Sequence, residues 1–282
     1  MNVLGVCSWS LRPASPGDLA DSLMACGVSN VQLALEPLRT GAWTRRDLDA
    51  ALSKAGVRLL SGMMAMHAED YSTLESIRKT GGVRPDAHWP SNLKAARAAA
   101  GLACDLGLSL VTFHAGFLPE RPHHPERATM LERLRTIADC FADQGVEVAL
   151  ETGQEDAQTL LAVLDELDRP RVGVNFDPAN MILYGMGDPV DALQRLAPYV
   201  KQIHIKDAIP AGVHGEWGTE VVVGTGAVDW DAFLAVVASR LPGVPMVIER
   251  EADETRVDDI RAAVAFLHSR GVVDDPQPTM GA

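Results

Sequence analysis

Four polar side chains stand where short apolar runs end in the second half of the chain. They are Glu151, Asp177, His204 and Glu249, and each directly follows an apolar residue. Burying three carboxylates close together is costly, through desolvation and mutual repulsion, unless a cation neutralises them. The set therefore predicts a divalent-metal site. Three oxygen ligands and one imidazole nitrogen favour Mn²⁺, with Mg²⁺, Co²⁺ or Zn²⁺ as alternatives.

Each of these residues has a simpler interpretation when it is taken alone. A single acidic residue at a strand end often caps a helix, pairs with an arginine or faces solvent. The coincidence of four such residues favours the metal site. Glu251 lies two residues after Glu249 and shares its face, because side chains alternate along a strand. Glu251 therefore stays open as an alternative fourth ligand.

A metal bound to a carbonyl and the adjacent hydroxyl acidifies the C–H bond between them by stabilising an enediolate. Glu151 and Glu249 are the candidate acid and base that move the proton. The predicted function is a sugar isomerase or epimerase acting on a keto or aldo sugar or a derivative. One alternative is a lyase or dehydratase that acts on a keto-polyol or a 3-keto-glycoside by β-elimination. A second alternative is a non-catalytic sugar-binding barrel.

Further candidates for substrate contact lie near other strand ends. His114 could hydrogen-bond a substrate hydroxyl or move a proton, and Lys206 could hold an enediolate oxygen or a phosphate. His67 follows the third expected strand, and Trp9 is a candidate wall for sugar stacking. A structural histidine, a surface ion pair or a core tryptophan is the alternative in each case. The turn Gly224–Gly226 is a weaker candidate for binding a phosphate through its backbone amides.

These side chains need a scaffold that brings distant strand ends together. Short β-rich apolar runs alternate with longer segments of helical spacing, which is typical of consecutive βα units. The expected strands are Val3–Trp9, Asn30–Leu35, Val57–Met64, Leu108–His114, Val146–Glu151, Arg171–Asp177, Val200–Lys206 and Pro245–Glu249. Eight units predict an α/β protein, a single-domain (β/α)8 TIM barrel over residues 1–273, with a flexible C-terminal tail over 274–282. An open doubly wound sheet is the less favoured architecture, because its glycine signature is missing.

Charge and hydropathy exclude several classes of partner. The 282 residues carry a formal net charge of −13, which repels phosphate backbones and argues against nucleic acid as a partner. No apolar run is long enough to cross a bilayer, and the first twelve residues lack the features of a signal peptide. We expect a cytoplasmic protein whose partner is a small sugar and which does not bind membranes.

Several motifs together resemble the xylose isomerase-like TIM barrel superfamily, in its sugar phosphate isomerase/epimerase branch. They are Glu151-Thr152-Gly153, Asn175-Phe176-Asp177-Pro178-Ala179-Asn180, His204-Ile205-Lys206-Asp207, Gly224-Thr225-Gly226-Ala227-Val228-Asp229-Trp230 and Ile248-Glu249-Arg250. The resemblance runs from about Val3 to His268. It implies that Glu151, Asp177, His204 and Glu249 bind the metal, that the two glutamates handle protons, and that the chain forms dimers or tetramers.

Two positions depart from the pattern of this superfamily. Ketose 3-epimerases that the chain resembles have a histidine where this chain has Asn180, and relatives often have a glutamate at the position of Ala227. Asn180 is therefore added to the candidates for substrate contact. The identity of the sugar stays open.

Overall fold

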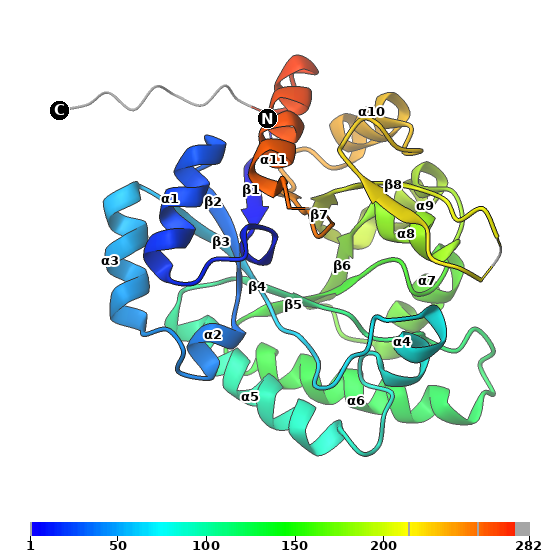
Figure 1. Ribbon diagram of the computed structural model, residues 1–282. Coiled ribbons are helices and arrows are strands. Elements are labelled where there is room, and N and C mark those ends of the chain that lie inside the picture. The colour runs from blue at the N-terminus through cyan, green and yellow to red at the C-terminus, as the bar shows by residue number, and fades with distance from the viewer. Residues whose placement is uncertain (1, 214, 253, 274–282) are drawn as a thin grey trace.

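Eight parallel strands close into a barrel in the computed structural model, which describes residues 2–213, 215–252 and 254–273 (Figure 1). The strands are β1 (Leu4–Cys7), β2 (Asn30–Ala34), β3 (Arg58–Met63), β4 (Leu110–Phe113), β5 (Glu147–Glu151), β6 (Val172–Phe176), β7 (Val200–Ile205) and β10 (Met246–Ile248). Neighbours in sequence pair in order, and β10 closes the ring against β1 with Leu4 opposite Met246. Each expected run contains one strand, so the predicted (β/α)8 barrel is confirmed.

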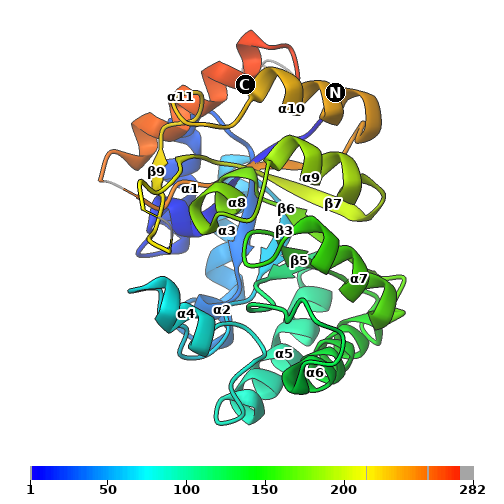
Figure 2. The same cartoon turned by 90° about the vertical axis from the view of Figure 1, so that its right-hand side faces the viewer.

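The helices lie outside the strands, with α10 and α11 on one side of the ring and α5 and α6 on the opposite side (Figures 1 and 2). The longer helices are α1 (Pro16–Cys26), α3 (Arg45–Ala55), α5 (Trp89–Asp105), α6 (Pro125–Ala142), α7 (Ala157–Leu167), α9 (Pro189–Leu196), α10 (Trp230–Arg240) and α11 (Arg256–Ser269). Shorter ones are α2 (Glu36–Arg39), α4 (Leu74–Thr80), α8 (Pro178–Tyr184) and the 3₁₀ helices η1 (Ser8–Leu11) and η2 (Ala197–Tyr199). None of the helices in the described ranges is long and apolar enough to span a bilayer.

Local sequence signals set the ends of α1. Ser15 has extended backbone and its hydroxyl accepts a hydrogen bond from the backbone N–H of Asp18, while Pro16 occupies the first helical position. Gly27 ends the helix with a φ of 71°, a conformation in which glycine has no steric penalty. Between these ends, Leu19 and Leu23 are fully buried in the apolar layer that separates the strands from the helices.

A short antiparallel hairpin, which the sequence pattern did not indicate, extends the rim after β7. It consists of β8 (Asp207–Ile209) and β9 (Thr219–Val221), and it packs against α8. The turn after the hairpin folds back onto Asp207, whose Oδ2 accepts hydrogen bonds from the amides of Gly224 (2.9 Å) and Gly226 (3.0 Å). These amides therefore bind a carboxylate of the same chain, and the proposed phosphate site at this turn is wrong.

The expected tail over residues 274–282 lies outside the described residues, so its flexibility stays a prediction.

Asp207 should be a major contributor to the stability of this rim. Its fully buried carboxylate also accepts hydrogen bonds from Val228 N and Trp230 Nε1. Asp207→Asn keeps the shape but replaces one acceptor oxygen by a donor, so buried N–H groups lose their partner. We expect the free energy of unfolding to fall by roughly 2–4 kcal/mol. Urea denaturation measures this change. The exposed Asp231→Asn serves as control, and equal stability of the two variants would contradict the assigned role.

Candidate metal centre

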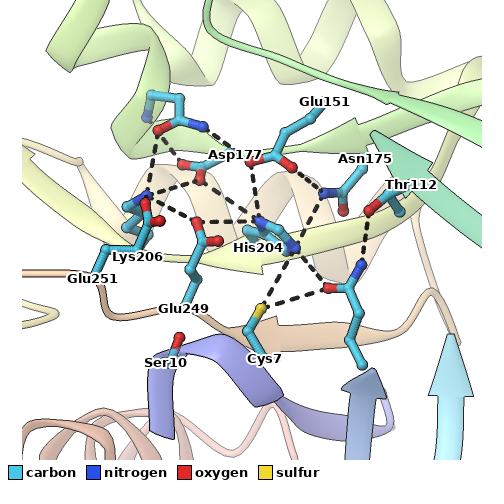
Figure 3. A network of polar contacts seen from close by, with 12 residues as sticks. Cys7, Ser10, Thr112, Glu151, Asn175, Asp177, His204, Lys206, Glu249 and Glu251 are labelled. Carbon is cyan, nitrogen blue, oxygen red and sulfur yellow. Dashed lines mark hydrogen bonds and ion pairs between the residues drawn. The ribbon is translucent and has the colours of Figure 1, made fainter. Parts of the chain in front are cut away.

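Four polar side chains meet at the carboxyl ends of β5, β6, β7 and β10, which are neighbours in the barrel (Figure 3). One ligand atom from each of Glu151, Asp177, His204 and Glu249 lies within 4.8 Å of all the others, and all four residues are buried. The Nδ1 atom of His204 is 3.4 Å from Glu151 Oε1, 3.7 Å from Asp177 Oδ2 and 3.5 Å from Glu249 Oε2. The fold thus brings together the four residues predicted as ligands.

Two atoms inside this cluster lack the partners that buried polar atoms normally have. Asp177 Oδ2 and His204 Nδ1 are buried and make no hydrogen bond with any described residue. Lys206 Nζ is 4.0 Å from Asp177 Oδ2, too far for a hydrogen bond. A carboxylate oxygen and an imidazole nitrogen that face one another without hydrogen bonds are a costly arrangement unless a cation lies between them. Three carboxylates and one imidazole are also a donor set that divalent ions accept. The residues present therefore fit a divalent metal ion.

Polar side chains behind His204 contact the ring nitrogen that faces away from the carboxylates. Its Nε2 atom lies 2.8 Å from Gln32 Oε1, and the Gln32 amide nitrogen donates to Thr112 Oγ1 at 2.8 Å. Gln32 presents an acceptor oxygen to His204 Nε2, and Asn175 Nδ2 lies 3.1 Å from the same nitrogen. In the tautomer with its proton on Nε2, His204 directs the Nδ1 lone pair toward the carboxylates, as metal binding requires. Cys7 Sγ lies 3.7 Å from the same Nε2 and so on the side of the ring facing away from the cluster.

Neutral amides orient Glu151 from two sides. Asn180 Nδ2 donates to Glu151 Oε1 at 3.0 Å, and Asn175 Nδ2 lies 3.3 Å from Oε2. Gly153 allows the approach of Asn180: its φ is 130°, and a Cβ atom there would lie 2.4 Å from the Asn180 Cβ. Asp177 caps α8 by accepting from Asn180 N at 2.9 Å. The motifs Glu-Thr-Gly and Asp-x-x-Asn thus fix the positions of Glu151 and Asp177 relative to each other, because Asn180 contacts both.

Lys206 contacts both candidates for the fourth ligand, Glu249 and Glu251, which differ in their other contacts and in exposure. Its Nζ donates to Glu249 Oε2 at 2.8 Å and to Glu251 Oε2 at 2.6 Å. Glu249 also accepts from Trp9 Nε1 at 2.7 Å and reaches the cluster, whereas the Glu251 side chain is 54% exposed. This geometry favours Glu249 over Glu251 as the fourth ligand and places Glu251 as a partner of Lys206.

The charges of the cluster oppose the effect of burial on most of its pKa values. Burial alone would raise the pKa of Glu249, but Lys206 and His204 hold it well below its usual value. The pKa of Glu151 is also lowered, because His114 and His204 outweigh burial. The pKa of Asp177 is raised by burial, which Lys206 only partly offsets. Glu249 and Glu151 thus stay ionised and available to a cation. Burial favours the neutral form of Asp177 as long as no cation lies beside its Oδ2.

The other predicted contact residues lie at different distances from the cluster. His114 lies beside Glu151, with its Nε2 3.6 Å from Glu151 Oε1. Trp9 lies on η1 just beyond β1 and donates a hydrogen bond to Glu249. Its candidate role as a wall for sugar stacking stays a prediction. His67 is exposed, and its ring packs edge-on against His88 at a centroid distance of 5.4 Å. The structure does not bring His67 to the cluster.

Sequence reasoning missed several polar and aromatic groups on the loops above the strands. Tyr71, Tyr184 and Gln154 lie after β3, β6 and β5, and both tyrosine pKa values are raised, first by burial and then by nearby charges that include Glu151 and Glu251. Glu155 follows on the same loop as Gln154 and is 6% exposed. No motif marked these residues. The only signal was their position in segments that follow expected strands.

Comparison with known proteins identifies the family. Residues 20–270 match the family described as "Xylose isomerase-like TIM barrel". The chain belongs to this family. A xylose isomerase domain protein from Planctomyces limnophilus is 30% identical, with a TM-score of 0.84 and coverage of 96% of both chains.

Members of the xylose isomerase-like TIM barrel family similar to this chain carry different activities in their names. A 3-oxo-isoapionate decarboxylase from Pectobacterium atrosepticum is 27% identical over 161 residues, which is 52% of this chain and 58% of the relative. The match therefore spans less than two thirds of that enzyme. A D-allulose 3-epimerase from Methylomonas sp., solved with D-allulose, is 16% identical, with a TM-score of 0.71 and coverage of 95% and 97%. At that identity the likeness shows the fold alone.

Metal binding can be measured directly. We expect protein dialysed against manganese, magnesium, cobalt or zinc to retain about one divalent ion per chain, with Mn²⁺ preferred. Asp177→Asn removes a charged ligand with little change of shape and should lower the affinity at least tenfold. Elemental analysis and calorimetric titration measure both quantities. Asp231→Asn is the control, and the absence of stoichiometric retention of every ion by the wild-type protein would exclude the site.

Glu155 should make stability depend on pH. Burial, with a smaller contribution from Asp156, raises the pKa of Glu155 to about 8. The folded state therefore keeps a proton that the unfolded state releases above its ordinary pKa of about 4.3. Stability is lost as the pH rises through this window, up to about pH 8. Glu155→Gln should exceed the wild type in free energy of unfolding by roughly 2–4 kcal/mol at pH 8, and the difference should vanish near pH 4.5.

Urea denaturation at several pH values measures this difference for Glu155→Gln. The exposed Glu254→Gln is the matched control for removing one negative charge. A difference of constant size between pH 4.5 and pH 8 would show that Glu155 is not protonated in the folded protein.

Proposed function

We propose that the protein is a divalent-metal-dependent sugar isomerase or epimerase that transfers a proton at the carbon next to a carbonyl group. The observation that supports this most directly is the placement of Glu151 and Glu249. They come from β5 and β10, the two outer strands of the four that form the cluster, and both lie about equally far from His204 Nδ1. A substrate bound at the cluster would lie between two carboxylates.

The chemistry follows from the contacts of these residues. A divalent ion held by the four side chains would stabilise negative charge on the carbonyl and hydroxyl oxygens of the sugar. One glutamate takes the proton from the carbon, and the electron pair of the C–H bond moves toward the carbonyl oxygen to form an enediolate. The other glutamate then delivers a proton to the opposite face or to the neighbouring carbon. Because Glu249 is held in its ionised form, the proton that it delivers must first pass to it from the ammonium group of Lys206, which contacts it. The first outcome is epimerisation and the second is aldose–ketose isomerisation.

The partners of the two glutamates suggest which one starts. Glu249 accepts hydrogen bonds from Lys206 and Trp9, and the ammonium group stabilises its ionised form and weakens it as a base. Glu151 is held by neutral amides and by His114, whose Nε2 is 3.6 Å away. We therefore assign the first proton removal to Glu151 and the opposite position to Glu249. His114 is placed to hydrogen-bond the substrate on the Glu151 side.

A lyase activity is the second candidate. The 27% identity to a decarboxylase over about half of the chain favours it. Loss of a carboxylate from the carbon next to a keto group passes through an enolate, and so does β-elimination of a hydroxyl from the carbon after that. The same residues would serve both outcomes. A sugar-binding barrel without activity is less favoured, because two carboxylates that both face the ligand position are more than binding requires.

Deuterium exchange tests the proposed proton transfer. Metal-loaded protein is incubated in D₂O with a panel of ketoses, inososes and 3-keto-glycosides. We expect deuterium at the carbon next to the carbonyl of at least one panel member, together with an epimer or isomer as product. Glu151→Gln and Glu249→Gln should each lower the exchange rate by at least 10²-fold, because each removes a proton-transferring group. NMR and mass spectrometry measure exchange and product.

Glu254→Gln is the control for loss of a carboxylate, since Glu254 is exposed and pairs with Arg12 away from the cluster. Exchange accompanied by loss of water or carbon dioxide would assign the lyase candidate. Tight sugar binding without exchange by the wild-type protein would support the binding-protein alternative. Unchanged exchange in both glutamine variants would remove the mechanism.

A further inference from the structure

Three aromatic side chains from separate rim segments form a continuous group, which we call the rim aromatics. Phe117 lies after β4, Tyr184 ends α8, and Trp217 lies between β8 and β9. The rings of Tyr184 and Trp217 are 4.9 Å apart and nearly edge-to-face, and those of Phe117 and Tyr184 are 5.6 Å apart. Phe117 is buried, whereas Tyr184 and Trp217 are half-buried and keep part of their surface accessible.

The hairpin that carries Trp217 is fixed against α8. Gly218 N donates to Leu183 O at 3.3 Å, and a Cβ atom on Gly218 would lie 2.7 Å from Ile209 O and 3.1 Å from Leu183 Cα. At its base the hairpin is held by the hydrogen bonds of Asp207. The position of Trp217 beside Tyr184 is therefore set by backbone contacts and does not depend on the two rings alone.

The rim aromatics adjoin the segments that carry two of the ligands: Tyr184 ends α8, which begins directly after Asp177, and the Tyr184 hydroxyl is near Gln154, three residues after Glu151. This hydroxyl lies 3.5 Å from Gln154 Nε2. Lys206, Glu151 and Glu251 are near enough to influence the pKa of Tyr184, which burial raises above its usual value. The phenol thus stays protonated beside the charged cluster. It presents a neutral hydroxyl next to an exposed aromatic surface.

Gln154 provides an independent indication of a ligand. The residue is 2% exposed, and its Oε1 atom is buried with no hydrogen-bond partner among the described residues. A buried amide oxygen without a donor costs about 1–3 kcal/mol, so such atoms normally have a partner in the functional state. The same amide contacts Tyr184 through its nitrogen. The missing donor would therefore lie beside the rim aromatics.

We infer that this rim binds the second ring of a glycoside whose keto-bearing ring lies at the metal centre. The apolar C–H face of a pyranose packs on the accessible faces of Tyr184 and Trp217, and one of its hydroxyl groups donates to Gln154 Oε1. An aromatic surface paired with a single neutral acceptor suits an uncharged sugar ring. This inference rests on the proposed function and narrows its substrate class from a single keto sugar to a 3-keto-glycoside with a further sugar ring.

A matched pair of probes tests the inference. One is a 3-keto disaccharide and the other is the methyl 3-keto-glucoside, which lacks only the second ring. Exchange in D₂O gives kcat/KM for each, and their ratio reports what the second ring contributes. We expect the wild-type protein to prefer the disaccharide at least tenfold. Trp217→Ala should lower this ratio about tenfold, mainly through KM, and Trp217→Phe should retain most of it because an aromatic ring remains.

Gln154→Leu should also lower the ratio, since leucine fills the space without an acceptor. Metal retention and the thermal unfolding temperature of each variant separate a lost contact from a loss of folding. Equal kcat/KM for the two probes in the wild-type protein, or a ratio that Trp217→Ala leaves unchanged, would overturn the inference. If wild-type protein exchanges small ketoses but neither probe, the glycoside inference fails while the proposed function stands. If it exchanges no member of the full panel, the proposed function itself fails.

Discussion

The mutual repulsion of buried carboxylates is the constraint on which the rest of this molecule depends. Glu151, Asp177 and Glu249 converge on one imidazole, and all three are almost completely buried. Lys206 offsets one negative charge, and Glu251, which it also contacts, is half in water. With all three carboxylates ionised and His204 neutral, as metal binding requires, the one ammonium group leaves two negative charges in a region of low dielectric. A divalent cation carries the charge that removes this imbalance.

The inside of the barrel supports the cluster with a chain of neutral amides and hydroxyls. Ser61 donates to Gln202 at 2.6 Å, Gln202 to Asn175 at 3.1 Å, and Asn175 reaches both Glu151 and His204. Ser61 lies on β3, Gln202 on β7 and Asn175 on β6, so the chain crosses the inside of the barrel. Apolar side chains fill the layer outside the strands, so the polar chain inside is available to orient ligands. The positions of the strands thereby fix the polar side chains that orient Glu151 and His204.

The sequence predicted the features of the fold and of the site that depend on hydrophobic periodicity and on the residues at strand ends. The eight strands and the four clustered residues follow from apolar runs and from the polar residue that ends each run, because a parallel barrel brings its carboxyl ends together. Contacts between loops were beyond this reasoning. The partnership of Asp207 with the Gly224–Gly226 turn joins residues about twenty positions apart. Taken alone, the turn was only a weak candidate for a phosphate site. The meeting of Phe117, Tyr184 and Trp217 depends on three loops whose paths have no sequence period.

Asn180 shows how one side chain links the two halves of the centre. Its Nδ2 donates to Glu151 at 3.0 Å, while its Oδ1 lies 3.4 Å from Lys206 Nζ, which in turn contacts Glu249. A side chain at this position must donate to a carboxylate and accept from an ammonium group at the same time. An amide does both without carrying charge. A neutral imidazole can also donate and accept, but its two nitrogens diverge by a fixed ring angle, and in its charged form it would only donate. The amide therefore couples the base on β5 to the lysine that follows β7, and it suits asparagine to a position where resembling ketose 3-epimerases have histidine.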